Sequence, residues 1–452
     1  MRDLKQRVQK TLRQEPSLRF VAPFLEAFPK GDLYLVGGAV RDLLLGRSTV
    51  DFDFVVRGVS REPLEAWFET RGRVDVTGRV FGVYKFVPTL PGLPTIPIDL
   101  ALPRTETALP GSLGGYRDFD TQSNPMLPIE ADLARRDFSI NACAFDLRRG
   151  TLIDVYQGQR DLEARIVRAV GNPTERFSED FSRMLRAIRF AVQLDFEIDT
   201  DTWDALCALM PELNRTRTRP DGGSEFVLPR ETIGRELAKA LTAHPLRAAR
   251  LLHDSGVLQA VLPDIARAAN ADAAGFFLPL ASKPSLPVTL ALLLRAASPD
   301  TAKRALDRAG LSSLPRDSVL RVAAEDVAWV VRGLQHIPAP ETVRAQPVLE
   351  IERMFMGLRG GMYLEALQAL GKTLLIDAIR ERVTSIRLAC KTPDGDIPQL
   401  INGSDVLAVG IPAGPKIRAW LDAVREEQLN GRLRKKDEAR AWLQAKMTSQ
   451  TD

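Results

Sequence analysis

The segment Leu35–Val56, LVGGAVRDLLLGRSTVDFDFVV, decides the fold because it joins a short apolar strand to a glycine turn, a helix and a second strand. Gly37 and Gly38 follow the apolar run 33–36, and residues 39–45 have the pattern of a helix whose free N-terminal amides favour an anion. Glycine also lets a phosphate approach the backbone closely. The pattern predicts a strand–turn–helix–strand unit, which is also common in α/β proteins that bind no phosphate.

Two acidic residues interrupt the second strand of this unit. Asp51 and Asp53 alternate with Phe52 and Phe54, and residues i and i+2 of a strand project from the same face. We therefore expect both phenylalanines in the core and both carboxylates side by side. Two like charges so close need a cation, and paired carboxylates with substrate phosphates commonly hold Mg²⁺. The alternative interpretation is an edge strand with two solvated aspartates.

A third carboxylate is available in the segment TIPIDLA. Asp99 could come from a neighbouring strand and complete the site as a base or a second metal ligand. A surface aspartate beside Pro97 would give the same sequence, so this role stays a hypothesis.

The composition predicts a globular protein of several domains in a reducing compartment. A chain of 452 residues, 45% of them hydrophobic, is too long for one core, and we expect two to four domains. Cys143, Cys207 and Cys390 are far apart and form no CxxC pair, which favours the cytoplasm and argues against a cysteine metal site. Charges and prolines break the longest apolar stretch, 275–297, so we expect no membrane span. The basic segment 1–14 is expected to be a surface helix rather than a transit peptide.

Hydrophobic patterning separates a mixed part from a helical part. Strand-like runs lie between residues 32 and 161, and long amphipathic runs follow Pro173. Turn-rich segments at 215–223, 336–347 and 391–398 break the helical part. The expected parts are an N-terminal helical extension (1–29), a mixed head (30–163), and a helical neck (164–265), body (266–390) and tail (391–452). The formal net charge of +4 permits a polyanionic partner without requiring one.

The double glycine, the spacer and the Asp-x-Asp pair resemble the nucleotidyltransferase superfamily typified by DNA polymerase β. Further segments, described next, narrow the resemblance to the class II tRNA nucleotidyltransferases, which are the CCA-adding enzymes and their bacterial poly(A) polymerase relatives. The resemblance is close over about residues 30–265 and recognisable in the tail. It implies an α+β fold, with a polymerase β-like head containing a small mixed sheet, followed by an all-helical neck, body and tail.

The segment DLARRDFSINA, 132–142, resembles the family's second motif, in which an Arg-Arg-Asp run contacts the sugar and triphosphate of the incoming nucleotide. Adjacent arginines need anions, and an aspartate can order a ribose hydroxyl, although a solvated basic turn has the same sequence. The residues that the resemblance implies for the triphosphate or sugar are Gly38, Arg41, Arg135, Arg136, Asp137 and Arg186.

The segment EDFSRMLRAIRFAVQLDF, 179–196, resembles the family's nucleobase-reading helix, with Asp180, Arg183, Arg186 and Arg189 at the matching positions. Steps of three residues on a helix drift by about 60°, so the first three share a face and Arg189 lies further round, where it binds phosphate or a neighbouring side chain. An acceptor carboxylate beside a donor guanidinium matches the base edge that cytosine and adenine share, and disfavours UTP and GTP. Ion pairs on an exposed helix are the alternative.

Four other segments match the family less specifically. RETIGREL, 230–237, has Glu231 and Glu236 in place but Thr232 where arginine is usual. The glycine-rich segment 104–120 resembles a flexible loop that full CCA-adding enzymes have and CC-only enzymes lack, or is a plain surface insertion. The remaining matches are a head–neck hinge (152–162; Asp154, Gly158, Asp161) and a tail that touches the tRNA body (400–421; Gly403, Asp405, Gly410, Gly414, Pro415).

A pair that imitates metal phosphohydrolases, His253-Asp254, is not interpreted as a site. Such sites need further histidines well separated in sequence, and only His244 and His336 remain. A His-Asp pair on a helix surface explains the motif.

The resemblance implies addition of C, C and A to the 3′ end of tRNA from CTP and ATP in the cytoplasm. Asp51 and Asp53 would hold Mg²⁺ and activate the 3′ hydroxyl for in-line attack on the α-phosphate, with pyrophosphate leaving. Alternatives are enzymes that add only A or only CC, a poly(A) polymerase, a small-molecule nucleotidyltransferase and a non-catalytic RNA-binding protein on this fold. The sequence leaves open the number of nucleotides added, the choice between monomer and homodimer, and the tRNA features that are read.

Overall fold

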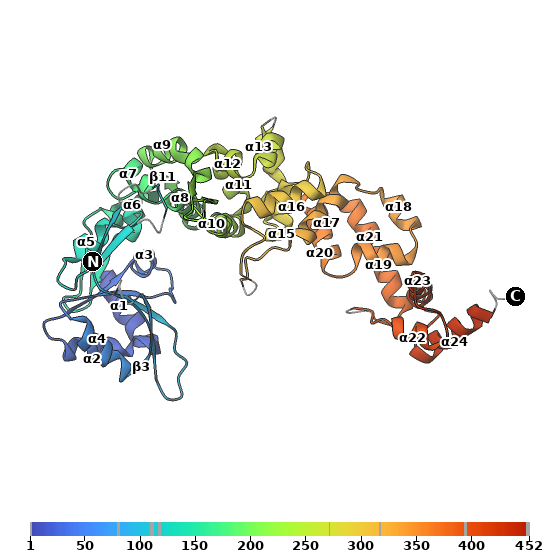
Figure 1. The fold of residues 1–452 in the computed structure, drawn as a ribbon, viewed down its shortest axis with the longest axis horizontal. Coiled ribbons are helices and arrows are strands. Elements are labelled where there is room, and N and C mark those ends of the chain that lie inside the picture. Colours follow the sequence, from blue (N-terminus) through green and yellow to red (C-terminus); the bar gives the residue numbers. More distant parts are fainter. Residues whose placement is uncertain are drawn as a thin grey trace. The chain divides into compact units, whose positions relative to one another are not determined.

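The structure is a computed structural model that describes residues 2–78, 82–108, 113–115, 119–270, 272–315, 318–392 and 396–448. The chain forms two compact units, Met1–Val261 and Leu262–Asp452 (Figure 1). In the ranges just given, no helix combines the length and the apolar character that crossing a membrane requires.

A seven-stranded mixed sheet lies at the centre of the head part of the first unit. Its order is β3-β4-β5-β2-β1-β8-β9, and β2 and β5 are parallel while the other neighbours are antiparallel. The strands are β1 (Asp32–Val36), β2 (Asp53–Arg57), β3 (Gly72–Gly78), β4 (Val83–Pro88), β5 (Ile98–Ala101), β8 (Ala144–Asp146) and β9 (Thr151–Ile153). The predicted α+β class with a mixed sheet in the head is confirmed.

The opening segment forms the predicted strand–turn–helix–strand unit. Gly37 has φ +68°, a conformation that favours glycine, and a Cβ there would lie 2.8 Å from Arg136 Nη1. Helix α3 (Gly38–Leu44) follows at once, one residue earlier than predicted. Phe52 and Phe54 are each 1% exposed, as expected from the alternation.

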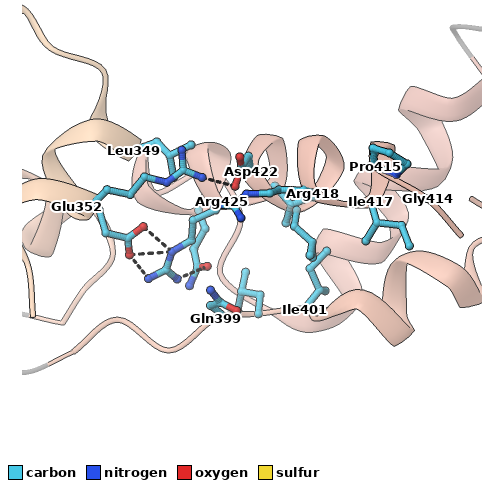
Figure 2. A pocket seen from close by; sticks show the side chains of 15 residues that line it. Leu349, Glu352, Gln399, Ile401, Gly414, Pro415, Ile417, Arg418, Asp422 and Arg425 are labelled. Atoms are coloured by element: carbon cyan, nitrogen blue, oxygen red, sulfur yellow. Dashed lines mark hydrogen bonds and ion pairs between the residues drawn. The ribbon is translucent and has the colours of Figure 1, made fainter. Parts of the chain in front are cut away.

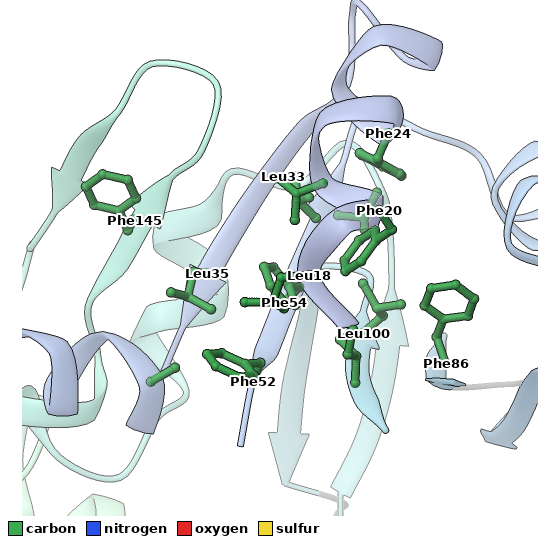
Figure 3. Close-up of a cluster of buried hydrophobic side chains, with 14 of the residues drawn as sticks. Leu18, Phe20, Phe24, Leu33, Leu35, Phe52, Phe54, Phe86, Leu100 and Phe145 are labelled. Carbon is green, nitrogen blue, oxygen red and sulfur yellow. The ribbon is translucent and has the colours of Figure 1, made fainter. Parts of the chain in front are cut away.

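Helices cover one face of the sheet through an aromatic core (Figure 3). The ring of Phe20 packs edge-on against Phe54 and Phe86, with centroids 5.6 Å apart in both pairs. The covering elements are α1 (Arg2–Gln14), η1 (Pro16–Phe20), α2 (Val21–Ala27) and α4 (Arg61–Glu69). Leu4 and Val8 of α1 are buried in this core, so the basic N-terminal segment is a helix whose apolar side belongs to the head.

The rest of the first unit is mostly helical. The helix α8 is buried along almost its whole length, including Met184 and Ile188, and packs against α10. The segment 215–223, expected to break the helical part, lies largely in a short hairpin, β12–β13. The elements are β6 (Arg104–Ala108), β7 (Phe119–Ser123), α5 (Ile129–Ala134), η3 (Ser139–Asn141), α6 (Gly158–Ala164), β10 (Ile166–Val167), α7 (Pro173–Glu179), α8 (Ser182–Leu194), β11 (Glu197–Ile198), α9 (Thr200–Leu209), η4 (Met210–Asn214), β12 (Thr216–Thr218), β13 (Ser224–Phe226), α10 (Arg230–Ala243), α11 (Pro245–Asp254) and α12 (Val257–Val261).

In the described part of the second unit, the assigned elements are all helices. They are α13 (Pro263–Ala269), α14 (Ala273–Phe277), η5 (Leu278–Ser282), α15 (Leu286–Leu293), α16 (Pro299–Arg308), α17 (Ala324–Gln335), α18 (Pro340–Ala345), α19 (Val348–Phe355), α20 (Leu358–Ala369), α21 (Thr373–Ala389), α22 (Gly403–Ala408), α23 (Lys416–Leu429) and α24 (Lys436–Thr448). A cavity of about 610 Å³ lies between α19 and α23 (Figure 2). Arg353 pairs with Asp422 there and Arg425 with Glu352, so these ion pairs join the two helices.

Asp405, which the tail motif singled out, is part of the architecture of α22. Its side chain accepts a hydrogen bond from the Asn402 N–H at 3.0 Å in a capping box, and it pairs with Lys436 and Arg440 of α24. These hydrogen bonds and cations hold the pKa of Asp405 well below its usual range. The carboxylate therefore joins α22 to α24.

Candidate active site

A cavity of about 960 Å³ lies where the ends of β2 and β5 face α8 and α10. Every site residue predicted from the sequence lines it, although these residues come from segments that are far apart in the chain. They are Gly38, Arg41, Asp51, Asp53, Asp99, Arg135, Arg136, Asp137, Asp180, Arg183, Arg186 and Arg189.

Three carboxylates meet at one end of this cavity. Asp53 and Asp99 stand opposite each other in the register of the parallel strands β2 and β5, and Asp51 comes just before β2. One oxygen from each lies within 4.8 Å of the others. No other group of three His, Cys, Asp or Glu side chains in the described ranges is close enough to hold a metal ion. The pair His253-Asp254, whose side chains bond to each other at 3.0 Å, is therefore no metal centre of that kind.

The electrostatics of these carboxylates favour a cation. Burial and the neighbouring charges of Asp51 and Asp99 together raise the pKa of Asp53 to about 6. Arg136 and Lys85 act in the opposite direction, and Lys85 Nζ lies 3.6 Å from Asp99 Oδ1. The raised pKa shows that three negative charges so close together repel one another, and a bound cation would relieve this repulsion. Three converging carboxylates also match the oxygen-rich donor set that divalent cations such as Mg²⁺ prefer.

The raised pKa of Asp53 predicts that Asp53→Asn stabilises the metal-free protein. Well below pH 3.8 the carboxyl group of Asp53 is protonated in both the folded and the unfolded state. As the pH rises from there to about 6 the unfolded chain ionises first, so the native state loses stability over this window. The substitution removes that loss, worth about 1–3 kcal/mol at pH 8. Urea unfolding with EDTA at pH 4 and pH 8 measures it, and an equal effect at both pH values would contradict the explanation.

The Arg-Arg-Asp run is held by internal ion pairs. Arg135 and Arg136 both bind Asp132, whose side chain is fully buried, at 2.7 and 3.2 Å. Asp137 is 8% exposed and accepts two hydrogen bonds from the Arg186 guanidinium. Arg186 and these hydrogen bonds hold the pKa of Asp137 at about 2 against the opposing effect of burial. These ion pairs fix both arginines and Asp137 in the wall of the cavity.

The prediction that Asp180 shares a helix face with Arg183 and Arg186 is wrong. Helix α7 ends at Glu179, Asp180 has extended backbone, and α8 begins at Ser182. The physical reason is tertiary: Phe181 is 2% exposed, and its N–H donates to the Gly114 carbonyl at 3.1 Å. Asp180 instead accepts a hydrogen bond from the Ser182 N–H at 2.8 Å, and burial raises its pKa.

Arg183 lies in the first turn of α8 and is almost fully buried. Its guanidinium donates to Glu179 Oε2 at 2.7 Å and to the Arg135 carbonyl at 3.2 Å. The break between α7 and α8 thus sets a carboxylate and a guanidinium three residues apart in sequence on the same cavity wall.

Arg189 binds a neighbouring side chain, the second of the two roles that the sequence left open. Its Nε donates to Glu236 Oε2 of α10 at 2.5 Å, and its guanidinium carbon lies 3.9 Å from the Phe190 ring centroid. Glu236, which matches the family's pattern in the segment 230–237, therefore joins α10 to α8.

Sequence reasoning missed several residues that line the cavity. Three guanidinium groups surround the ring of Phe190. The guanidinium carbons of Arg41, Arg186 and Arg189 lie 5.3, 5.5 and 3.9 Å from the ring centroid. The position of Phe190 next to Arg189 was the available signal. The others are Lys85, Arg104, Asn141, Thr232, Arg235 and Lys239. Those on α10 follow a helical spacing that one sequence does not distinguish from an ordinary solvated face.

Two further segments that the sequence singled out are the predicted hinge, 152–162, and the glycine-rich segment, 104–120. The hinge residues hold backbone in place, and part of the glycine-rich segment lies outside the described residues. Asp154 accepts hydrogen bonds from the N–H groups of Gly158 and Gln159 at the start of α6, and Asp161 bonds Ser139 at 2.5 Å. The glycine-rich segment 104–120 begins in β6, but residues 109–112 and 116–118 lie outside the described residues.

Comparison with known proteins shows what this geometry is similar to. Residues 33–168 match the model of the poly(A) polymerase head domain. Proteins called Multifunctional CCA protein from Xanthomonas oryzae and Stenotrophomonas maltophilia are 40% and 39% identical over 237 residues, 52% of this chain and 51–52% of theirs. The chain thus matches about half the length of these curated relatives. The Bacillus stearothermophilus CCA-adding enzyme, solved in complex with CTP, superposes with a TM-score of 0.68 at 25% identity, covering 97% of this chain and 99% of that one.

By these matches residues 33–168 resemble a poly(A) polymerase head domain, and the fold of the chain is similar to that of a CCA-adding enzyme. The Thermotoga maritima CCA-adding enzyme, solved with tRNA, shares the fold at a TM-score of 0.61 and 24% identity, covering 97% of this chain and 98% of that one. The chain departs at Thr232 from the pattern that the resemblance implies. The ion pair of Arg189 with Glu236 joins α8 to α10 without an arginine at position 232.

Proposed function

We propose that this protein adds C, C and A to the 3′ end of tRNA from CTP and ATP, with release of pyrophosphate. The observation that carries the proposal is that the three carboxylates, the glycine turn and the Asp180–Arg183 pair line one cavity. The relatives called Multifunctional CCA protein and the CCA-adding enzyme solved with CTP support it. On this proposal the protein works in the cytoplasm, where tRNA is matured.

In the proposed reaction the chain's own residues orient two substrates. The carboxylates of Asp51, Asp53 and Asp99 would hold Mg²⁺, which activates the attacking hydroxyl and stabilises the charge on the α-phosphate when it is bound. Arg41 and Arg136 flank the glycine turn and bind the triphosphate. The terminal 3′ hydroxyl attacks the α-phosphorus, the bond to the bridging oxygen breaks, and pyrophosphate leaves.

Base selection follows from the groups at the break before α8. Asp180 accepts from an exocyclic amino group and Arg183 donates to the adjacent ring nitrogen, an order that cytosine and adenine offer and that uracil and guanine reverse. UTP or GTP would leave these groups unpaired. The protein would therefore serve as its own template.

The decisive experiment uses tRNA transcripts that lack one, two or three terminal nucleotides, each incubated with single nucleoside triphosphates and with CTP plus ATP. CCA addition predicts products of defined length that stop at the mature end. Addition of only CC or only A identifies a partial enzyme, and unlimited adenosine tails identify a poly(A) polymerase. Extension of none of the transcripts would overturn the proposal.

Arg183→Ala is expected to relax discrimination against UTP by about 10- to 100-fold relative to CTP, because the lost donor no longer favours the correct edge. Ratios of kcat/KM for the two nucleotides measure the effect. Glu179→Gln is the matched control, since it removes the charge of the ion-pair partner of Arg183 and leaves the donor. Unchanged rejection of UTP in the alanine variant would count against templating by Arg183.

A further inference from the structure

Most cations that line the active-site cavity have carboxylate partners inside the protein. Arg186 pairs with Asp137 and Arg189 with Glu236, each at 2.5 Å. The remaining pairs are Arg41–Asp42, Lys85–Asp99, Arg135–Asp132, Arg136–Asp132 and Arg183–Glu179. These pairs fix the cations in place and compensate much of their charge.

Two cations of the same cavity differ from these. Arg235 and Lys239 are one turn apart on α10, and no ion pair joins either of them to any residue in the described ranges. Arg235 is exposed and Lys239 is half-buried. Burial lowers the pKa of Lys239, and the nearby guanidinium groups of Arg189, Arg235 and Arg186 add to this effect. Positive charge is therefore concentrated on this wall of the cavity.

The carboxylate that acts on Lys239 is already engaged. Glu236 acts against the lowering of the pKa of Lys239, but its side chain bonds Arg189 at 2.5 Å and is 7% exposed. A mobile phosphate from outside the protein is thus the natural partner of Arg235 and Lys239, since Lys and Arg side chains commonly bind phosphate oxygens.

We propose that Arg235 and Lys239 bind the phosphodiester backbone of the RNA strand whose 3′ end is extended. This inference rests on the proposed function. The triphosphate occupies the wall formed by the glycine turn and Arg136, next to the carboxylates, and the incoming base lies at Asp180 and Arg183. A strand that delivers its 3′ hydroxyl to the carboxylates must place its preceding phosphates along another wall, and α10 supplies the cations there.

The geometry of α10 suits one strand. Residues four apart on a helix lie on the same side and are separated by about 6 Å along the axis. Thr232, one turn before Arg235, lines the same cavity and adds a hydroxyl donor to the strip. Such contacts position RNA without reading its sequence, as expected for a group that must accept any tRNA.

The test compares Arg235→Gln, Lys239→Gln and the double variant with the native protein. The dissociation constant for tRNA lacking CCA, measured by fluorescence anisotropy across a salt series, is expected to rise about 5- to 10-fold for each substitution. The slope of log K against log salt should fall by about 0.7 for each lost contact. The KM for CTP should stay within twofold. Arg250→Gln, an exposed arginine of α11 outside the cavity, is the matched control, and Lys239→Arg should restore binding.

Two results would overturn the inference. If the KM for CTP rises while RNA affinity and its salt slope are unchanged, the cations bind the triphosphate instead. If none of these quantities changes in variants with native melting temperatures, the cations bind no phosphate. Because the binding assay needs no catalysis, it separates this inference from the proposed function, which fails if the native protein binds tRNA but does not extend it.

Discussion

Asp53→Asn is expected to lower the rate of nucleotide transfer to tRNA by about 10³-fold or more, the largest effect on activity in this protein. Asp53 is the central member of the triad, since it pairs in register with Asp99 and its pKa responds to both other carboxylates. The amide keeps the shape of the side chain and removes the charge that would hold a divalent cation. Single-turnover incorporation of labelled CMP under saturating Mg²⁺ measures the loss.

The control for this prediction is Asp75→Asn on β3, an exposed carboxylate of the same sheet that lies outside the cavity. It should leave the rate unchanged. Asp53→Asn should be inactive and yet more stable than the native protein at pH 8, as active sites that concentrate like charges sacrifice stability for function. Transfer at a near-native rate by Asp53→Asn would remove the triad from the mechanism.

Arg189→Met is expected to destabilise the protein by about 3–5 kcal/mol, because it leaves the carboxylate of Glu236 buried without its partner. Both side chains are nearly buried, with 10% and 7% exposure, and they join α8 to α10. Urea unfolding of the full chain, followed by circular dichroism, measures the change.

A double variant separates this cost from loss of packing. Arg189→Met combined with Glu236→Leu removes both charges, and it should recover most of the stability that the single substitution loses, because well-packed apolar residues often replace buried ion pairs at little cost. Equal instability of the single and double variants would show that the arginine matters for its packing on Phe190 rather than for its charge.

Short-range sequence patterns predicted which residues line the cavity better than they predicted the backbone conformation of those residues. The alternation of Asp51 to Phe54 is a short-range pattern, and burial of the phenylalanines followed directly from it, although β2 begins only at Asp53 and Asp51 is not part of the strand as predicted. Asp180 illustrates the opposite case. The helical spacing from Asp180 to Arg189 continues without a break in the sequence, but burial of Phe181 and its bond to Gly114, some 67 positions away, end α7 before Asp180.

The sequence alone determined the chemical groups of this protein: an acidic pair after a glycine turn, an Arg-Arg-Asp run and a helix rich in arginine. Only the tertiary structure decided which of these charges are engaged. Asp137, Arg186, Arg189 and Glu236 compensate one another across contacts between distant segments, while Arg235 and Lys239 have no such partner in the described ranges. Charge pairing depends on distances between side chains that only the packed elements fix, and for that reason spacing along the chain did not reveal it.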